Sequence, residues 1–264
     1  MSQKKVHFYY SYPGNKYNEM NCIYPSINLD GISKIIEPFA GGCGFSFYIW
    51  ENNKDKNFTY YINDLDTFLF EFYKIASNPD LEKQIEKDMH DWVDKIMELT
   101  DIEERRKVYN SIKNLGTISS HLFIHRYYCI RPGLYPQNLK TWNKFYFDKM
   151  PIHQFFKTAN VIATNIDGNN IFEKYCNQED CLIFLDPPYL DSNNAFYCSL
   201  KGINIYERLW HEKMNSKAAA LYMVLEKNYI TDALFGENQI HSYAKRYLMK
   251  GGRDTIHSVY SNRR

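Results

Sequence analysis

The segment Leu182-Ile183-Phe184-Leu185-Asp186-Pro187-Pro188-Tyr189 is the most informative stretch of this 264-residue chain. The apolar run at its start predicts a buried β-strand that ends at Asp186. The two prolines that follow fix the backbone and remove two N–H donors, so that carbonyl acceptors lie beside the carboxylate. A carboxylate, a rigid carbonyl and an aromatic ring together suit an exocyclic amine on a flat base. The alternative is a strand followed by an ordinary proline-rich turn.

A glycine-rich segment lies upstream, Glu37-Pro38-Phe39-Ala40-Gly41-Gly42-Cys43-Gly44-Phe45. It joins a predicted strand at 32–37 to a predicted helix that begins at 45–50, and such a turn lets the backbone approach a ligand closely. Asp64 follows the next predicted strand, at 58–62, where an acid can accept hydrogen bonds from ribose hydroxyls. The pair predicts a nucleotide-like cofactor. The alternative is a structural turn and a helix-capping aspartate.

The order of the expected elements predicts an α/β fold with a mostly parallel sheet. Further strands are expected at 160–164, 181–185, 218–225, 243–249 and 255–260, the last two suggesting an antiparallel ending. Helical spacing of apolar residues occurs at 66–76, 81–99, 103–115, 119–128 and 152–156, while 129–150 is irregular. We therefore expect a sheet domain made of residues 1–79 and 156–264, interrupted by an inserted, mainly helical region at 80–155.

The charge is unevenly distributed although the net charge is only +1. Residues 80–104 carry ten acidic side chains and three lysines, whereas 105–157 carry ten Lys or Arg and one acid. The basic stretch is also rich in aromatic residues, a combination that favours nucleic acid. The alternative is that these segments are solvated helix faces.

Several classes of protein are not favoured. No apolar run approaches the 18 residues of a membrane span, and the N-terminus does not resemble a secretory signal. The six cysteines form no C-x-x-C pair, which is typical of reduced thiols in an intracellular protein. His121, His125 and His153 have no carboxylate or cysteine at ligand spacing, so no metal site is expected.

The glycine loop and Asp-Pro-Pro-Tyr together resemble the Dam-type (D12, alpha-group) adenine-N6 DNA methyltransferases. The order of parts is also similar to that family: cofactor loop, inserted target-recognition region, then the tetrapeptide. Tyr12-Pro13-Gly14-Asn15-Lys16 resembles the opening motif of the family. The resemblance implies a Rossmann-like class I methyltransferase fold that uses S-adenosylmethionine. It also implies catalysis by Asp186, Pro187, Pro188 and Tyr189.

The resemblance extends to cofactor-binding residues. It implies that Tyr12 and Lys16 close over the methionine part of the cofactor and that Asp64 holds its ribose. Asn165 or Ile166 would lie near its adenine, and Asp186 would serve both cofactor and target. The loop residues implied to line the cofactor are Pro38, Phe39, Ala40, Gly41, Cys43, Gly44 and Phe45.

The expected macromolecular partner is double-stranded DNA. An adenine amine inside a duplex is paired, so the nucleotide must rotate out, at a cost of about a few kcal/mol. Lys140 and Lys144 are expected to contact phosphates, and Arg126 and Arg131 are the best candidates for contacts where side chains read base edges. The full set of expected DNA-binding residues is Arg126, Arg131, Tyr135, Asn138, Lys140 and Lys144; for each cation the alternative is an ordinary surface charge.

Two departures from the family pattern leave alternatives open. The loop pattern of the family is Phe-x-Gly-x-Gly. In this chain Cys43 occupies the last position of that pattern, and Gly44 comes one place later. The basic residue usual in the recognition region is replaced by Pro136. An RNA or protein-glutamine methyltransferase, or a catalytically inactive DNA-binding relative, are the competing hypotheses. Nothing in the sequence predicts the target sequence or the oligomeric state.

Overall fold

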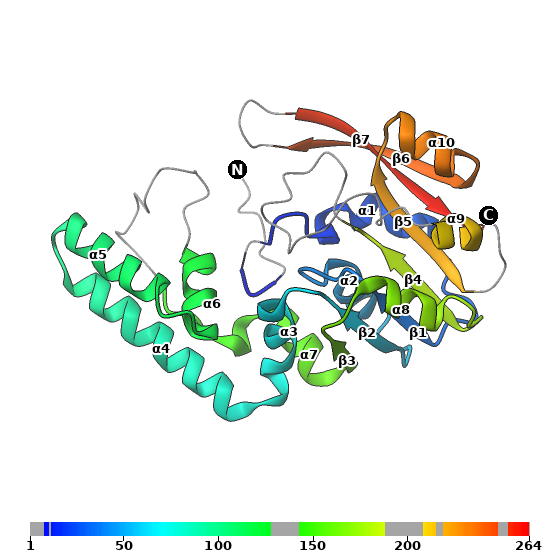
Figure 1. Cartoon of the computed structure of the whole chain (residues 1–264). Coiled ribbons are helices and arrows are strands. Elements are labelled where there is room, and N and C mark those ends of the chain that lie inside the picture. Colours follow the sequence, from blue (N-terminus) through cyan, green and yellow to red (C-terminus); the bar gives the residue numbers. More distant parts are fainter. Residues whose placement is uncertain are drawn as a thin grey trace. The chain divides into compact units, whose positions relative to one another are not determined.

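The chain forms two compact units in a computed structural model that describes residues 8–10, 12–127, 143–187, 208–214, 219–247 and 253–263 (Figure 1). Residues 1–14 and 71–158 make up a helical unit, and residues 15–70 and 159–264 make up a sheet unit. The sheet unit holds the glycine loop, Asp64 and Asp186. The unit boundaries are 70/71 and 158/159, whereas the boundaries expected from the sequence are 79/80 and 155/156. The N-terminal residues 1–14 cluster with the helical unit, although the sequence analysis assigned them to the sheet domain.

The sheet unit is built on a seven-stranded sheet within the described residues, in the order β3-β2-β1-β4-β5-β7-β6. The strands are β1 (Lys34–Glu37), β2 (Thr59–Asn63), β3 (Asn160–Thr164), β4 (Cys181–Leu185), β5 (Ala220–Glu226), β6 (Gln239–Tyr247) and β7 (Arg253–Ser261). The first five run parallel, whereas β7 is antiparallel to both β5 and β6. This arrangement confirms the α/β fold and the antiparallel ending predicted from the sequence.

The strand order places a switch point in the middle of the sheet. β1 lies between β2 and β4, so the connections that follow β1 and β4 leave toward opposite sides. In open α/β sheets, ligands bind outside the carboxyl ends of the strands at such a point. The topology therefore selects the edge formed by the ends of β1 to β4 as the place to look for a site.

Helices cover both faces of the central strands. On one face, Trp210 from α9 (Arg208–Met214) and Phe172 from α8 (Gly168–Tyr175) pack with Ile183 of β4 and Leu221 of β5. On the other face, α2 (Gly44–Asn52) places Phe45 in a stack on Phe184, with ring centroids 4.0 Å apart. All five strands of the parallel part and α2 were expected from the sequence.

The shorter helices of the sheet unit were not expected. They are η1 (Lys16–Glu19), α1 (Met20–Ile23), η2 (Tyr24–Ser26), α8, α9, α10 (Tyr229–Phe235) and η7 (Gly236–Asn238). Helices of one or two turns show little periodicity, but two of them carry start signals. Asp167 caps α8 by accepting from the Asn169 amide, and Asn228 forms a capping box with Thr231 at α10.

The helical unit has three helices that pack on one another, α4 (Pro79–Glu98), α5 (Ile102–Lys113) and α6 (Ile118–Tyr127). Their positions confirm the predicted helices at 81–99, 103–115 and 119–128 over the described residues. Asn78 and Asp101 cap α4 and α5, and acidic side chains occupy both first turns, where the helix dipole favours them. α3 (Thr67–Lys74), η3 (Ile75–Ser77), η4 (Phe147–Lys149) and α7 (Pro151–Thr158) complete the described elements.

The N-terminal segment contributes to the aromatic core of the helical unit. Tyr9 is fully buried, its ring contacts Phe147 at 5.4 Å, and its hydroxyl lies 3.2 Å from His153 Nδ1. His153 in turn lies 3.2 Å from the Glu82 carboxylate. His153 is therefore a buried polar group of this core.

Two kinds of feature are absent from the part of the chain that the structure describes. None of its helices is long and apolar enough to cross a membrane. Its His, Cys, Asp and Glu side chains form no group of three or more that could hold a metal ion. His121 and His125 lie close together, with ring centroids 4.3 Å apart, but within an aromatic cluster that includes Tyr10.

Candidate active site

The predicted site residues of the sheet unit gather at the carboxyl edge of the parallel strands. The glycine loop follows β1, Asp64 follows β2, Asn165 and Ile166 follow β3, and Asp186 follows β4. Because parallel strands end at the same edge, segments up to 149 residues apart in sequence are brought together there. Pro188 and Tyr189, which complete the tetrapeptide, lie outside the described residues.

The glycine loop contains an unusual backbone conformation at Cys43. Its φ of 51° and ψ of 31° are left-handed, a conformation that L side chains other than Asn and Asp rarely adopt. Its amide donates to the Ala40 carbonyl at 2.7 Å, and its carbonyl accepts from the Phe47 amide. The loop therefore keeps the backbone geometry of a glycine at the position where the family pattern has one, and strain of this kind is common at functional sites.

Gly44 has a different role, which is to admit a neighbouring segment. A Cβ atom at Gly44 would lie 2.1 Å from Asn15 Oδ1 and 2.5 Å from the Tyr17 amide nitrogen. Asn15 caps η1 by accepting from that Tyr17 amide, and its Nδ2 donates to the Gly42 carbonyl at 3.1 Å. The close approach fixes η1 against the glycine loop and so fixes Lys16, the next residue, at the site.

Asp64 is held by the backbone around it. Its carboxylate accepts from the Gly41 amide at 2.8 Å and the Asp66 amide at 2.9 Å. Burial raises the pKa of Asp64 to about 6, although these amide bonds oppose the shift. Asn165 donates from Nδ2 to the Asp64 carbonyl at 2.7 Å. Asp64 thus links the glycine loop to the ends of β2 and β3.

Two further residues at this edge were not predicted from the sequence. Asn63 is buried, and its side chain bonds the Pro38 carbonyl and both the amide and carbonyl of Ile166, which joins the ends of three strands. Leu65 is 47% exposed and Ile166 is 44% exposed. Exposed apolar side chains of this size beside an acid suit a flat ligand ring. Ile166 was expected near the cofactor's adenine, whereas the only signal of Leu65 in the sequence was its position next to Asp64.

Lys16 and Asp186 form a buried ion pair. The Lys16 ammonium donates to Asp186 Oδ2 at 2.6 Å, and the two side chains are 5% and 20% exposed. Burial alone would lower the pKa of Lys16, but the carboxylates of Asp186 and Glu19 raise it well above its usual value. Burial raises the pKa of Asp186, and Lys16 opposes that shift. Lys16 is therefore the group that most strongly opposes protonation of Asp186.

A third acid, Glu37, lies beneath this edge at the end of β1. It is buried, and its carboxylate accepts from the Ser46 amide in the first turn of α2 at 3.0 Å. Burial raises the pKa of Glu37 to about 8. Glu37 was not predicted as a site residue, because an acid at the end of a strand carries no signal of its burial.

The remaining predicted cofactor residues have varied surroundings. The Phe45 ring is fully buried against Phe184, so only its backbone is available to a ligand. Phe39 is half-buried and contacts Trp210 at 5.8 Å between ring centroids. Tyr12 belongs to the helical unit, where its ring lies 6.2 Å from that of Phe8.

Of the predicted DNA-binding residues, the structure describes Arg126 and Lys144. Arg126 donates to the Tyr9 carbonyl at 3.0 Å and its guanidinium lies 5.2 Å from the centre of the Phe145 ring. Lys144 pairs with Asp94 at 2.7 Å on the surface of the helical unit. Arg131, Tyr135, Asn138 and Lys140 lie outside the described residues.

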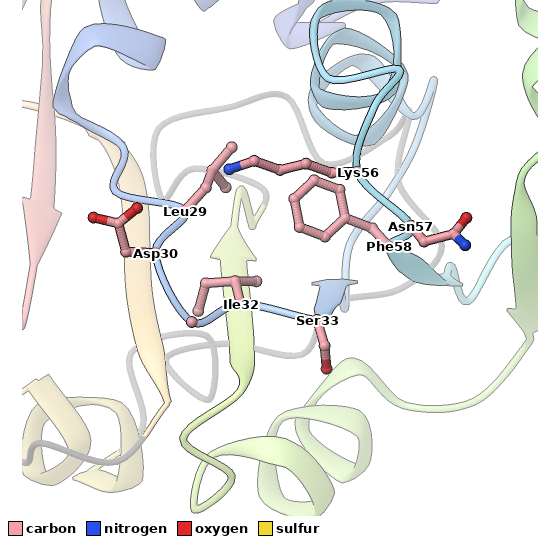
Figure 2. A pocket seen from close by; sticks show the side chains of 8 residues that line it. Leu29, Asp30, Ile32, Ser33, Lys56, Asn57 and Phe58 are labelled. Atoms are coloured by element: carbon pink, nitrogen blue, oxygen red, sulfur yellow. The ribbon is translucent and has the colours of Figure 1, made fainter.

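A pocket of about 350 Å³ lies at the other edge of the sheet, before the first residues of β1 and β2 (Figure 2). Leu29, Ile32 and Phe58 line it together with the charged residues Asp30 and Lys56. None of the predicted site residues lines this pocket. It lies at the amino ends of the strands, where the topology does not favour a ligand, and we assign it no function.

The comparisons with known proteins agree with this geometry. The family described as D12 class N6 adenine-specific DNA methyltransferase has a model that matches residues 12–249 of the chain, which include the glycine loop, Asp64 and Asp186. A search of curated proteins gave no match. The family match covers well over half of the 264 residues. The chain therefore belongs to the D12 class N6 adenine-specific DNA methyltransferases.

Proposed function

We propose that the protein transfers a methyl group from S-adenosylmethionine to the N6 amine of adenine in double-stranded DNA, after the base rotates out of the duplex. The observation that carries this proposal is the buried Lys16–Asp186 pair, 2.6 Å long, at the sheet edge that also holds the glycine loop and Asp64. The pair provides a largely buried carboxylate whose negative charge the Lys16 ammonium stabilises.

The residues at this edge fit S-adenosylmethionine. Asp64 can accept from ribose hydroxyls, and the exposed side chains of Leu65 and Ile166 can pack on an adenine ring. The Lys16 ammonium suits the carboxylate of the methionine part. When bound, the cofactor supplies an electron-poor methyl group on a sulfonium. Tyr12, Asn165 and the loop residues are proposed as further contacts, Phe45 through its backbone.

Asp186 and Pro187 act on the target amine. The lone pair of the adenine amine is delocalised into the ring, which makes it a poor nucleophile. Acceptors on its two hydrogens, from the Asp186 carboxylate and the Pro187 carbonyl, localise that lone pair on nitrogen. A carboxylate offers about four lone-pair sites, so Asp186 can accept from Lys16 and from the amine together. Pro188 keeps the segment rigid, and Tyr189 stacks on the base.

The DNA is proposed to meet the helical unit through its basic residues. Lys140 and Lys144 contact phosphates, while Arg131, Tyr135 and Asn138 lie in the segment that reads bases. Arg126 supports this surface through its bonds to the Tyr9 carbonyl and its packing on Phe145. Phosphate contacts set position and base contacts set sequence preference, so the two groups have separable effects.

Mass-spectrometric nucleoside analysis tests the reaction. Mixed-sequence duplex DNA is incubated with the protein and S-adenosylmethionine beside an Asp186→Ala control. We expect N6-methyladenine with the intact protein only. If cofactor binding is measured but no DNA base is methylated, the same assay on RNA and on protein glutamine tests the competing substrates, and methylation of neither identifies an inactive relative.

A further inference from the structure

A second carboxylate, Glu19, lies beside the Lys16–Asp186 pair and has no part in the mechanism above. Glu19 is three residues after Lys16 on the short 3-10 helix η1. Side chains at i and i+3 eclipse in a 3-10 helix, so both project from the same side of η1. The Glu19 side chain is only 11% exposed. A charged group so deeply placed requires partners.

Those partners come from the β6–β7 hairpin at the far end of the chain. The Tyr243 hydroxyl donates to Glu19 Oε2 at 2.7 Å, and the Lys245 ammonium donates to Oε1 at 2.7 Å. His257 Nδ1 lies 3.3 Å from Oε2. Tyr243 is opposite His257 in the strand register, and Lys245 is two residues along, so the three side chains share one face of the hairpin.

The four charged groups at this point are balanced, and a further titratable group, the buried Glu37, also acts electrostatically on Lys16 and Asp186. Lys16 and Lys245 are cations, and Glu19 and Asp186 are carboxylates, all largely buried. Burial would raise the pKa of Glu19, but Lys16, His257 and Lys245 together hold it well below its usual value. Burial and the charge of Lys16 lower the pKa of Lys245. Glu19 is thus an anion placed between two lysines.

We propose that Glu19 is a positioning residue for methyl transfer, which keeps Lys16 protonated and keeps Lys245 away from Asp186. This inference rests on the proposed function, because it assigns Glu19 to the same reaction. Without the Glu19 charge, two buried cations share one carboxylate. One lysine then loses its proton at lower pH, and Asp186 is drawn toward whichever remains charged, which misplaces the acceptor for the adenine amine.

The test is the pH profile of kcat for Glu19→Gln, measured as N6-methyladenine formed with saturating cofactor and DNA. Removing an opposite charge at this range moves a pKa by about 1–3 units. The basic limb of the profile, which is the fall of kcat as pH rises, is expected to lie at alkaline pH in the wild type, because the carboxylates around Lys16 raise its pKa. Glu37, whose pKa burial raises to about 8, also acts electrostatically on Lys16 and Asp186, and it contributes the same titration to every variant compared here. For E19Q we expect kcat to be about tenfold lower, because residues that orient a functional group through a hydrogen bond commonly have effects of this size, as they do for metal ligands. The basic limb of the E19Q profile should lie at least about one pH unit lower than in the wild type.

Two further variants separate charge balance from a structural role. Glu19→Gln combined with Lys245→Met removes one charge of each sign, and it should return the basic limb toward the wild-type position and recover kcat. In the Lys245→Met variant, Glu19 no longer pairs with Lys245 and still acts on Lys16. The basic limb of this variant should therefore lie at the same pH as that of the wild type, or at a higher pH. Lys245→Met tests the proposal even if E19Q does not fold, because a basic limb at lower pH than in the wild type would contradict the proposal.

Glu51→Gln is the matched control. Glu51 lies in the same unit and also accepts from a tyrosine hydroxyl, that of Tyr17, but it is exposed. Its profile should match that of the wild type. An E19Q profile of unchanged shape overturns the role of Glu19 even if thermal stability falls. If the wild-type protein itself forms no N6-methyladenine, the proposed function has failed instead, so the two failures are distinguishable.

Discussion

Two lysine–carboxylate pairs of nearly equal length distinguish the two units of the molecule. In the sheet unit, Lys16 lies 2.6 Å from Asp186, with side chains 5% and 20% exposed. In the helical unit, Lys144 lies 2.7 Å from Asp94, with side chains 39% and 52% exposed. Distance alone would rank them together, but water screens the second pair and hardly reaches the first. Burial, rather than distance, therefore distinguishes the pair that is proposed to act in catalysis from the pair that is not.

Removing each lysine gives the largest contrast. Lys16→Met leaves the largely buried Asp186 carboxylate without its ion-pair partner, and breaking a buried pair in this way costs about 3–5 kcal/mol of unfolding free energy. Lys144→Met leaves Asp94 in water and should not change stability measurably. Urea denaturation of both variants at pH 7.5 checks the prediction. Equal losses would show that the two pairs are energetically alike and that the comparison is mistaken.

The two units also use glycine differently, and this gives the second contrast. Gly44 in the sheet unit faces Asn15 and the Tyr17 backbone at less than 3 Å from an added Cβ, and backbone atoms cannot move away cheaply. Gly44→Ala should therefore cost about 1–3 kcal/mol, as overpacking does, and should weaken cofactor binding because η1 carries Lys16.

Gly116 in the helical unit is the matched control for Gly44. Its φ is +64°, but an added Cβ meets nothing within 4 Å. Gly116→Ala should cost only the left-handed strain, about 1 kcal/mol, and leave cofactor affinity unchanged. Denaturant unfolding and calorimetric titration with S-adenosylmethionine measure both effects. Unchanged cofactor affinity in Gly44→Ala would mean that η1 is not part of the cofactor site.

The position of the site could be predicted from the sequence because its signals are local. A glycine-rich turn after one strand, an acid after the next and Asp-Pro-Pro-Tyr after a third are each legible in a few residues. The parallel topology then brings them to one edge. Cys43 departs from the loop pattern of the family, which has glycine at this position. The loop accommodates the cysteine because Cys43 itself adopts the left-handed backbone conformation that glycine would adopt there.

The charge network could not be predicted, because its members are far apart in sequence and individually ordinary. Glu19 lies 224 residues before Tyr243 and 226 before Lys245. Only the antiparallel register of β6 and β7 places Tyr243, Lys245 and His257 on one face. Similarly, nothing in the sequence shows that Glu37 is buried or that Leu65 is exposed. The short helices α8 to α10 were missed because one or two turns leave little periodicity.

Burial also gives the sheet unit a pH dependence near neutrality. Burial raises the pKa of Asp64 to about 6, so this carboxyl is charged above pH 6 and takes up a proton below it. The ionised form accepts better from ribose hydroxyls. Affinity for S-adenosylmethionine should therefore fall as pH decreases through 6, by up to about tenfold per unit.

Calorimetric titration between pH 5 and pH 8 checks the dependence on Asp64. The Asp64→Asn variant should bind more weakly at pH 8 and show a flatter profile, because its amide does not titrate in this range. The raised pKa of Asp64 affects the free energy of unfolding in the opposite direction. The cofactor-free protein gains stability from this group as pH falls below 6, since the folded state binds the proton more readily than the unfolded state. A variant with the wild-type pH slope would exclude Asp64 as the titrating group.

The smallest expected effect concerns Lys140 and Lys144 in the helical unit. Each phosphate contact adds about 0.9 to the slope of log affinity against log salt. If Lys140 and Lys144 both contact phosphates, changing both to Met should make the slope shallower by up to about two. Fluorescence anisotropy with a labelled duplex at several salt concentrations measures it.

Two controls make this last measurement a test of the comparison between the units. Lys56 and Lys174 are exposed in the sheet unit, before β2 and at the end of α8 respectively, both remote from the carboxyl edge. Changing both to Met should leave the salt slope unaltered; a similar flattening would mean that DNA does not select the helical unit.

Asp94→Asn should strengthen binding, because Lys144 then no longer has to leave a carboxylate to reach a phosphate. Exposed pairs exchange partners at little cost, so the same feature that makes Lys144 unimportant for folding makes it available to DNA.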